Sequence, residues 1–180
     1  FLAGGPIGAI VGGLAGAVIG AQAGIATSTI EYAGNNPVET VVIDGDIADI
    51  LGQSLPWQDL DGATVLVTGA AGMIPAYAVY TLLGLNDVRD AGITVLALVR
   101  DPEKARRQFG PVADRSDLVL VQGDVRHPIE IDRRIDLVIH GASPARPALH
   151  AASPVDTIRA NVTGAFGLLD LCVASGGARF

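Results

Sequence analysis

The sequence holds a single cysteine, Cys172, and a single lysine, Lys104, among its 180 residues. One cysteine excludes an internal disulfide bond and a zinc site built from cysteine ligands. Lysine and arginine together number 12 against 19 acidic residues, which gives a net charge of −7. Nucleic-acid binding needs clustered basic side chains, so this balance argues against a nucleic-acid partner. A hydrophobic fraction of 49% argues against intrinsic disorder.

Charged residues are absent from the first 30 positions. Residues 31–62 then carry seven acids and no base, so the whole net charge of −7 lies in this stretch. Residues 63–180 hold the other 12 acids and all 12 bases, and this part is neutral overall. The distribution predicts a hydrophobic segment at 1–30, an acidic connector at 31–62 and a globular unit at 63–180.

Glycine recurs at every fourth position of the first segment, from Gly4 to Gly24. On a helix this spacing places the glycines on one face, where a second helix can approach closely. The charge-free length exceeds the about 20 residues that cross a bilayer, so we expect a glycine-zipper helix that contacts or spans a membrane. The alternatives are a signal peptide and an irregular stretch of glycine and alanine.

The connector contains apolar residues at positions 43, 47, 50 and 51. Their spacing predicts a short amphipathic helix over residues 43–51. Pro56 is expected to end this part, with Trp57 placed to pack on the next unit. A plain linker is the alternative interpretation.

The globular unit alternates short apolar runs with helical stretches. Strands are predicted at 64–68, 93–99, 118–121 and 135–139. Helices are predicted at 73–85, 101–109 and 153–174, with Asp101 as the cap of the second and a capping box at Ser153 opening the third. Alternating strands and helices form a parallel sheet covered on both faces. Right-handed crossovers then predict a doubly wound α/β fold with strand order 3-2-1-4.

The turn between the first strand and its helix is a candidate binding site for a dinucleotide. Gly69 permits a tight turn, and Gly72 lets the backbone approach a pyrophosphate at the N–H groups of the helix start. The position of a usual third glycine holds Pro75, which removes an N–H and adds bulk. The preceding strand and the following helix favour a dinucleotide site. A tight turn without a ligand is the alternative.

Ligands of such sheets bind at the carboxyl ends of the strands. Arg100 follows the second strand and favours a 2′-phosphate, hence NADP over NAD, unless it is a plain surface arginine. Asp124 follows the third strand and is suited to accept from an adenine amine or to shape a turn. His140 ends the fourth strand, where a structural role is favoured. The small residues Ala142 and Ser143 after it leave room for a cofactor.

As a set, these motifs resemble the extended short-chain dehydrogenase/reductases and, more narrowly, the NAD-dependent epimerase/dehydratases of nucleotide sugars. The matching segments are Val65–Ile74, Asp124-Val125, His140–Ser143 and Asn161–Gly164. The lead-in Leu55–Leu60 is similar to that of UDP-glucuronate decarboxylase-like members. The resemblance covers about residues 44–180 and implies a Rossmann-type domain that binds NAD or NADP.

The resemblance also implies which residues contact the cofactor. Those at the pyrophosphate are Gly69, Gly72, Met73 and Ile74. Those at the adenosine are Arg100, Asp124 and Val125. Those at the nicotinamide are Ala142 and Ser143. Two departures from the family pattern are Pro75, in place of the third glycine, and Gly141, where alanine is commoner.

The family's catalytic Tyr-x-x-x-Lys motif is not found, because Lys104 lies at no such spacing from Tyr32, Tyr77 or Tyr80. The resemblance places that motif beyond Phe180. We therefore expect an N-terminal fragment of a cytoplasmic nucleotide-sugar enzyme, without catalytic or metal-binding residues of its own and inactive alone. A homodimer and membrane contact through residues 1–30 are further expectations. The alternatives are a non-catalytic NAD(P)-binding module and a membrane-attached assembly protein.

Overall fold

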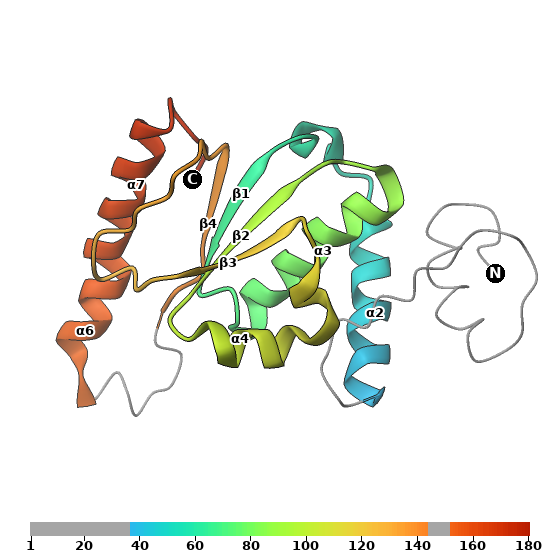
Figure 1. The fold of residues 1–180 in the computed structure, drawn as a ribbon, viewed down its shortest axis with the longest axis horizontal. Coiled ribbons are helices and arrows are strands. Elements are labelled where there is room, and N and C mark those ends of the chain that lie inside the picture. The colour runs from blue at the N-terminus through green and yellow to red at the C-terminus, as the bar shows by residue number, and fades with distance from the viewer. Residues whose placement is uncertain (1–36, 144–151) are drawn as a thin grey trace, which may run out of the picture.

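Four parallel strands form one sheet in the part that the computed structural model describes, residues 37–143 and 152–180 (Figure 1). Along the chain these are β1 (Thr64–Thr68), β2 (Thr94–Val99), β3 (Leu118–Gln122) and β4 (Leu137–His140). Their spatial order is β3-β2-β1-β4, which confirms the predicted order 3-2-1-4. In the register of the sheet, Val65 of β1 lies between Val95 of β2 and Leu137 of β4.

Helices cover both faces of this sheet (Figure 1). One face carries α2 (Pro37–Leu51), α3 (Met73–Arg89) and α4 (Pro102–Phe109). The other carries α7 (Gly164–Ala174), which follows α6 (Pro154–Ile158). Alternate side chains of β1 point to opposite faces of the sheet. Val65 and Val67 pack in the apolar cluster under α3, whereas Leu66 packs with Leu168 of α7 on the other face. Burial on both faces explains the continuous apolar runs of the sequence.

The helices α3 and α4 begin where the sequence predicts. Asp101 caps α4, since its Oδ1 accepts from the Lys104 N–H at 2.9 Å, and Pro102 occupies the first helical position. α3 runs past the predicted end at residue 85 to Arg89 and stops at Asp90, which adopts a left-handed conformation with φ 55°. The predicted end is too early because Asp90, and not a glycine, adopts the left-handed conformation that ends this helix.

The acidic connector contributes a packed helix. α2 begins six residues before the predicted start at position 43, and it buries Ile47 and Leu51 in the core beside α3. The hydroxyl of Tyr77 in α3 donates to Asp46 Oδ2 at 2.8 Å. Trp57, in a 3₁₀ turn over Trp57–Leu60, also packs against this core, as predicted. A plain linker is therefore the wrong interpretation of this stretch.

The predicted long helix at 153–174 is divided into three parts. α6 passes into a π-helical turn over Arg159–Thr163, and α7 follows. Ser153 does precede the helix, but its side chain makes no capping hydrogen bond, so the predicted capping box is wrong. Ser153 has φ −142° and ψ 65°, and the side chain of Asp156 pairs instead with Arg126 at 3.5 Å and Arg159 at 3.6 Å.

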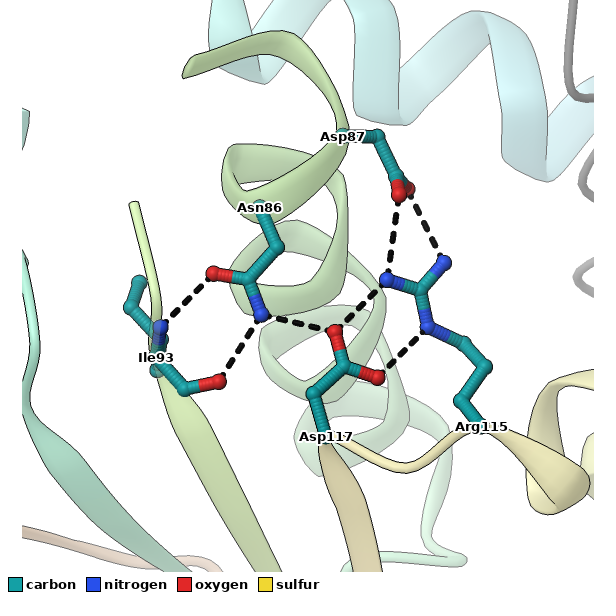
Figure 2. A network of polar contacts seen from close by, with 5 residues as sticks. All are labelled: Asn86, Asp87, Ile93, Arg115 and Asp117. Atoms are coloured by element: carbon teal, nitrogen blue, oxygen red, sulfur yellow. Dashed lines mark hydrogen bonds and ion pairs between the residues drawn. The ribbon is translucent and has the colours of Figure 1, made fainter. Parts of the chain in front are cut away.

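A network of polar side chains ties α3 to the amino ends of β2 and β3 (Figure 2). Asn86 donates to the Ile93 carbonyl at 2.8 Å and to Asp117 at 2.7 Å, and its own carbonyl accepts from the Ile93 N–H. Arg115 pairs with Asp117 at 2.7 Å and with Asp87 at 3.0 Å. Burial alone would raise the pKa of Asp117, but the hydrogen bonds from Arg115 and Asn86 hold this pKa below its ordinary value. All of these contacts lie at the amino edge of the sheet, opposite the turn after β1.

Among residues 37–143 and 152–180, no helix is both long and apolar enough to cross a membrane. The predicted glycine-zipper helix at 1–30 lies outside the described residues. Its membrane contact therefore stays a prediction.

Candidate dinucleotide-binding site

The turn after β1 is tight because Gly69 adopts a left-handed conformation with φ 64°. A Cβ at Gly69 would lie 2.8 Å from the Cα of Ala142 and 3.0 Å from the carbonyl oxygen of Gly141. Both the conformation and the space therefore require glycine here. The Gly72 N–H donates to the Gly69 carbonyl at 2.7 Å and closes the turn.

The start of α3 presents backbone N–H groups that no side chain caps. Gly72 is the N-cap residue and makes no side-chain capping bond, and the first helical bond runs from the Ala76 N–H to the Gly72 carbonyl at 2.9 Å. The N–H groups of Met73 and Ile74 precede that bond, and a helix start gives such groups no partner within the helix. Met73 and Ile74 are themselves 80% and 76% exposed. Such a helix start suits the negative charge of a pyrophosphate.

The hydroxyl of Thr68 joins the ends of β1 and β4. Its Oγ1 accepts from the N–H groups of Gly141 and Ala142, both at 3.2 Å, and lies 2.8 Å from Nδ1 of His140. A hydroxyl has two lone pairs and one proton, so the Thr68 proton goes to His140 Nδ1. This arrangement fixes Ala142, a predicted nicotinamide contact, directly beside the turn at Gly69.

His140 is neutral in this setting. Partial burial lowers the pKa of His140 below its ordinary value, while a hydrogen bond to the Ala160 backbone opposes that shift. Because Nδ1 accepts from Thr68, the proton of the neutral ring lies on Nε2. The contacts support the structural role that the sequence favours for this histidine.

Asp124 is held by a partner that the sequence reasoning missed. Arg126 pairs with the Asp124 carboxylate through Nε at 3.0 Å and Nη2 at 2.7 Å, and its N–H donates to the same group. These hydrogen bonds lower the pKa of Asp124 to about 2. The Asp-x-Arg spacing was the available signal. Asp124 shapes a turn, and its predicted contact with an adenine amine stays a prediction.

The other predicted contacts lie at the same edge of the sheet. Arg100 is exposed after β2, and its charge also lowers the pKa of Asp124. Val125 is buried against Gly164 of α7, where an added Cβ would come within 3.1 Å of the valine side chain. Ser143 is exposed beyond β4. An open hollow of about 540 Å³, not predicted from the sequence, lies between Val125–Ile129 and one side of α7.

The two tyrosines of α3, Tyr77 and Tyr80, make structural contacts with neighbouring helices. Burial raises the pKa of Tyr80 to about 12, and its ring packs edge to face on Phe109 with 5.8 Å between ring centres. Tyr77 is bonded to Asp46, and this bond raises the pKa of its phenol. Neither group is poised to move a proton near neutral pH.

The sheet order and the glycine turn define the class: a Rossmann-type α/β domain with a turn suited to a dinucleotide. The model of the NAD dependent epimerase/dehydratase family matches residues 65–180. Because this match covers more than half of the chain, the chain belongs to that family. The resemblance read from the sequence is thereby confirmed, and so, for the family, is the cofactor type, NAD or NADP.

Two curated relatives agree with this assignment, and one solved structure shares the fold. The chain is 29% identical over 119 residues to UDP-glucuronic acid decarboxylase 2 of Arabidopsis thaliana, covering 66% of this chain and 25% of that protein. It is 32% identical over 117 residues to UDP-glucose 4-epimerase of Azospirillum brasilense, covering 62% of this chain and 30% of that protein. The chain thus spans less than a third of either relative.

The solved structure is that of Pen from Bacillus thuringiensis. It matches with a TM-score of 0.51 at 19% identity, over 64% of this chain and 36% of that one. This likeness concerns the fold alone.

Proposed function

We propose that this chain is the cofactor-binding part of an NAD(P)-dependent epimerase, dehydratase or decarboxylase of nucleotide sugars. The observation that carries the proposal is the turn Gly69–Gly72, which leads into an uncapped helix start beside the end of β4. Family membership supports the reaction class. The names of both relatives specify a UDP-sugar, which supports a nucleotide sugar as the substrate of the whole protein.

In this proposal the N–H groups of Met73 and Ile74 hold the pyrophosphate at the start of α3. The residues around the adenosine are Arg100, Asp124 and Val125, and those around the nicotinamide are Ala142 and Ser143. When bound, the cofactor supplies reversible hydride transfer, while the protein supplies position. The proline at position 75 is the third helical residue, so it costs no hydrogen bond within the helix.

The chain alone would bind the dinucleotide without turnover, because its sequence contains no Tyr-x-x-x-Lys. The same observation favours a second candidate, a non-catalytic NAD(P)-binding module. A nucleotide sugar separates the two. If the whole protein, of which this chain is the cofactor-binding part in this proposal, converts UDP-glucose or UDP-glucuronate, the enzyme is supported, and if it binds NAD or NADP without converting either sugar, the binding module is supported.

Calorimetric titration with NAD and with NADP tests the site itself. We expect saturable binding that Gly69→Ala weakens at least ten-fold, because the added Cβ would meet Ala142 and the left-handed backbone disfavours alanine. Gly45→Ala in α2 is the matched control, since nothing lies within 4 Å of its added Cβ. Arg100→Ala should weaken NADP more than NAD. Failure of the unaltered chain to bind either dinucleotide would contradict the proposed function.

We also propose a homodimer through α6 and α7. An apolar stripe of exposed side chains follows these helices at spacings of three and four residues: Val155, Ile158, Val162, Phe166, Leu169 and Val173. Phe166→Glu should convert a dimer into a monomer in analytical ultracentrifugation, whereas Glu103→Gln on α4 should not. A monomeric unaltered chain would refute this part of the proposal.

Contact of residues 1–30 with a membrane, in an otherwise cytoplasmic protein, also stays a proposal. Flotation with lipid vesicles, with and without those residues, tests it. Loss of flotation on their removal is the expected result, and a chain that never floats contradicts it.

A further inference from the structure

The two residues that depart from the family pattern, Pro75 and Gly141, meet each other in the structure. Pro75 is the third residue of α3 and is buried, and Gly141 directly follows β4. A Cβ added at Gly141 would overlap Cγ of Pro75 and lie 3.2 Å from Pro75 Cβ. The proline ring thus fills the space that an alanine side chain at position 141 would need.

This overlap is steric and not a matter of backbone strain. The φ of Gly141 lies outside the left-handed region, so alanine can adopt its conformation. The ring of Pro75 is closed onto its own backbone, so it cannot rotate away as a long side chain would. An added methyl group must therefore displace the segment after β4 or the first turn of α3, which carries the N–H groups of Met73 and Ile74.

A second contact holds the turn from the opposite side. Gln108 of α4 donates from Nε2 to the Ala71 carbonyl at 2.8 Å. The neighbouring N–H of Ala70 donates to the Leu98 carbonyl of β2 at 3.3 Å. The turn is therefore fixed by β4 through Pro75, by α4 through Gln108 and by β2 through its backbone.

We propose that Pro75, Gly141 and Gln108 are a matched set of positioning residues for the turn Gly69–Gly72 and the start of α3. Gly141 supplies the room that Pro75 needs, and Gln108 fixes the carbonyl of Ala71. None of the three touches the cofactor through its side chain in this proposal. The consequence for cofactor binding rests on the proposed function, whereas the matched packing does not.

A double-mutant cycle on the 180-residue chain tests the match. Gly141→Ala should lower the melting temperature by about 5 °C, because the added Cβ overlaps the buried ring of Pro75. In a chain that already carries Pro75→Gly, the same substitution should lower it by less than half as much, because the obstructing ring is gone and only the Thr68 carbonyl oxygen, 3.2 Å from the added Cβ, still crowds it. Pro75→Ala should relieve the loss only in part, since its Cβ still lies 3.2 Å from the added methyl group. Gly45→Ala controls for the effect of replacing a glycine by alanine.

A positional readout separates placement of the turn from stability alone. Gly141→Ala should shift the backbone amide resonances of Gly72, Met73 and Ile74 and weaken NAD binding at least ten-fold. Both changes should be reversed when Pro75→Gly is added. Gln108→Glu keeps the size of the side chain but removes the N–H donor, so it should shift the same resonances. Glu103→Gln, on the exposed face of α4, should not.

The outcomes are distinguishable. Equal losses of melting temperature from Gly141→Ala in both backgrounds would overturn the match between Pro75 and Gly141. A coupled loss with unmoved amide resonances would overturn the positioning role, and unmoved resonances in Gln108→Glu would remove Gln108 from the set. If the unaltered chain binds neither NAD nor NADP, the proposed function fails. Even then, the amide resonances and the melting temperatures test whether Pro75, Gly141 and Gln108 position the turn.

Discussion

At the scale of single residues, Thr68 matters more than its short side chain suggests. The residue is fully buried at the end of β1, and its hydroxyl satisfies two backbone N–H groups and one histidine nitrogen of β4 and the segment after it. A buried donor without an acceptor costs about 1–3 kcal/mol. Thr68 therefore determines how closely β4 can follow the glycine turn.

Thr68→Val removes the hydroxyl and keeps the shape. We expect it to lower the free energy of unfolding by about 2 kcal/mol, because the Ala142 N–H loses its acceptor while the Gly141 N–H keeps only the Thr68 carbonyl, also at 3.2 Å. Urea denaturation measures the loss, and Thr68→Ser, which keeps the hydroxyl, should recover most of it. Equal stability of the valine variant and the unaltered chain would show that these bonds contribute nothing net.

His140 gives the same edge of the sheet a pH dependence. Its pKa lies below the ordinary value of 6.5 in the folded chain, so as pH falls below 6.5 the unfolded chain binds the proton first. Its contribution to stability should therefore be complete above pH 6.5 and decline below it. Urea midpoints between pH 7.5 and 5 should fall less in His140→Gln than in the unaltered chain, and His127→Gln, at an exposed site, is the control.

At the scale of elements, the polar network of Figure 2 sets the distance between the end of α3 and the strands. The side chain of Asn86 bonds both backbone groups of Ile93, as a neighbouring strand would. Arg115 then bridges Asp87 of α3 and Asp117, which directly precedes β3. Together these contacts hold the amino edge of the sheet while the glycine turn holds its carboxyl edge.

Asn86→Ala should lower the free energy of unfolding by about 3 kcal/mol, because both backbone groups of Ile93 lose their partner and Asp117 keeps only Arg115. Asp61→Asn, which breaks an exposed pair with Arg89, should cost about 0–1 kcal/mol. Chemical denaturation compares the two. A loss in Asn86→Ala no larger than that in Asp61→Asn would contradict the structural weight given to this network.

At the scale of the whole molecule, α2 is part of the core and not an addition to it. Ile47 is 1% exposed and lies in the same apolar cluster as Val65 of β1 and Leu83 of α3. The domain in the described residues therefore begins before the segment that the family model covers, residues 65–180.

Ile47→Ala should cost about 2–5 kcal/mol of unfolding free energy, as cavities in well-packed cores do. Val42→Ala, at a side chain 55% exposed on the same helix, should cost far less. Thermal or urea unfolding of both variants provides the comparison. Similar small effects of the two substitutions would show that α2 is dispensable for the domain.

The local signals of the sequence were sufficient for most of the fold. Short apolar runs, the cap at Asp101 and the glycine pair at 69 and 72 lie within a few residues of the structure they specify. Right-handed crossovers then fixed the strand order β3-β2-β1-β4 without further information. The same local reasoning failed at Ser153, whose side chain makes no capping bond, while Asp156 pairs with Arg126 from another part of the chain and with the nearby Arg159.

The sequence by itself determined the Rossmann-type architecture, the place of the turn and the presence of two unusual residues, Pro75 and Gly141. Only the tertiary structure decided that these two residues are in contact. It also decided that Gln108 donates a hydrogen bond to the Ala71 carbonyl and that Arg126 pairs with Asp124. The physical reason is distance along the chain. Periodicity and capping act between near neighbours, whereas steric match and side-chain pairing depend on which segments the folded sheet brings together.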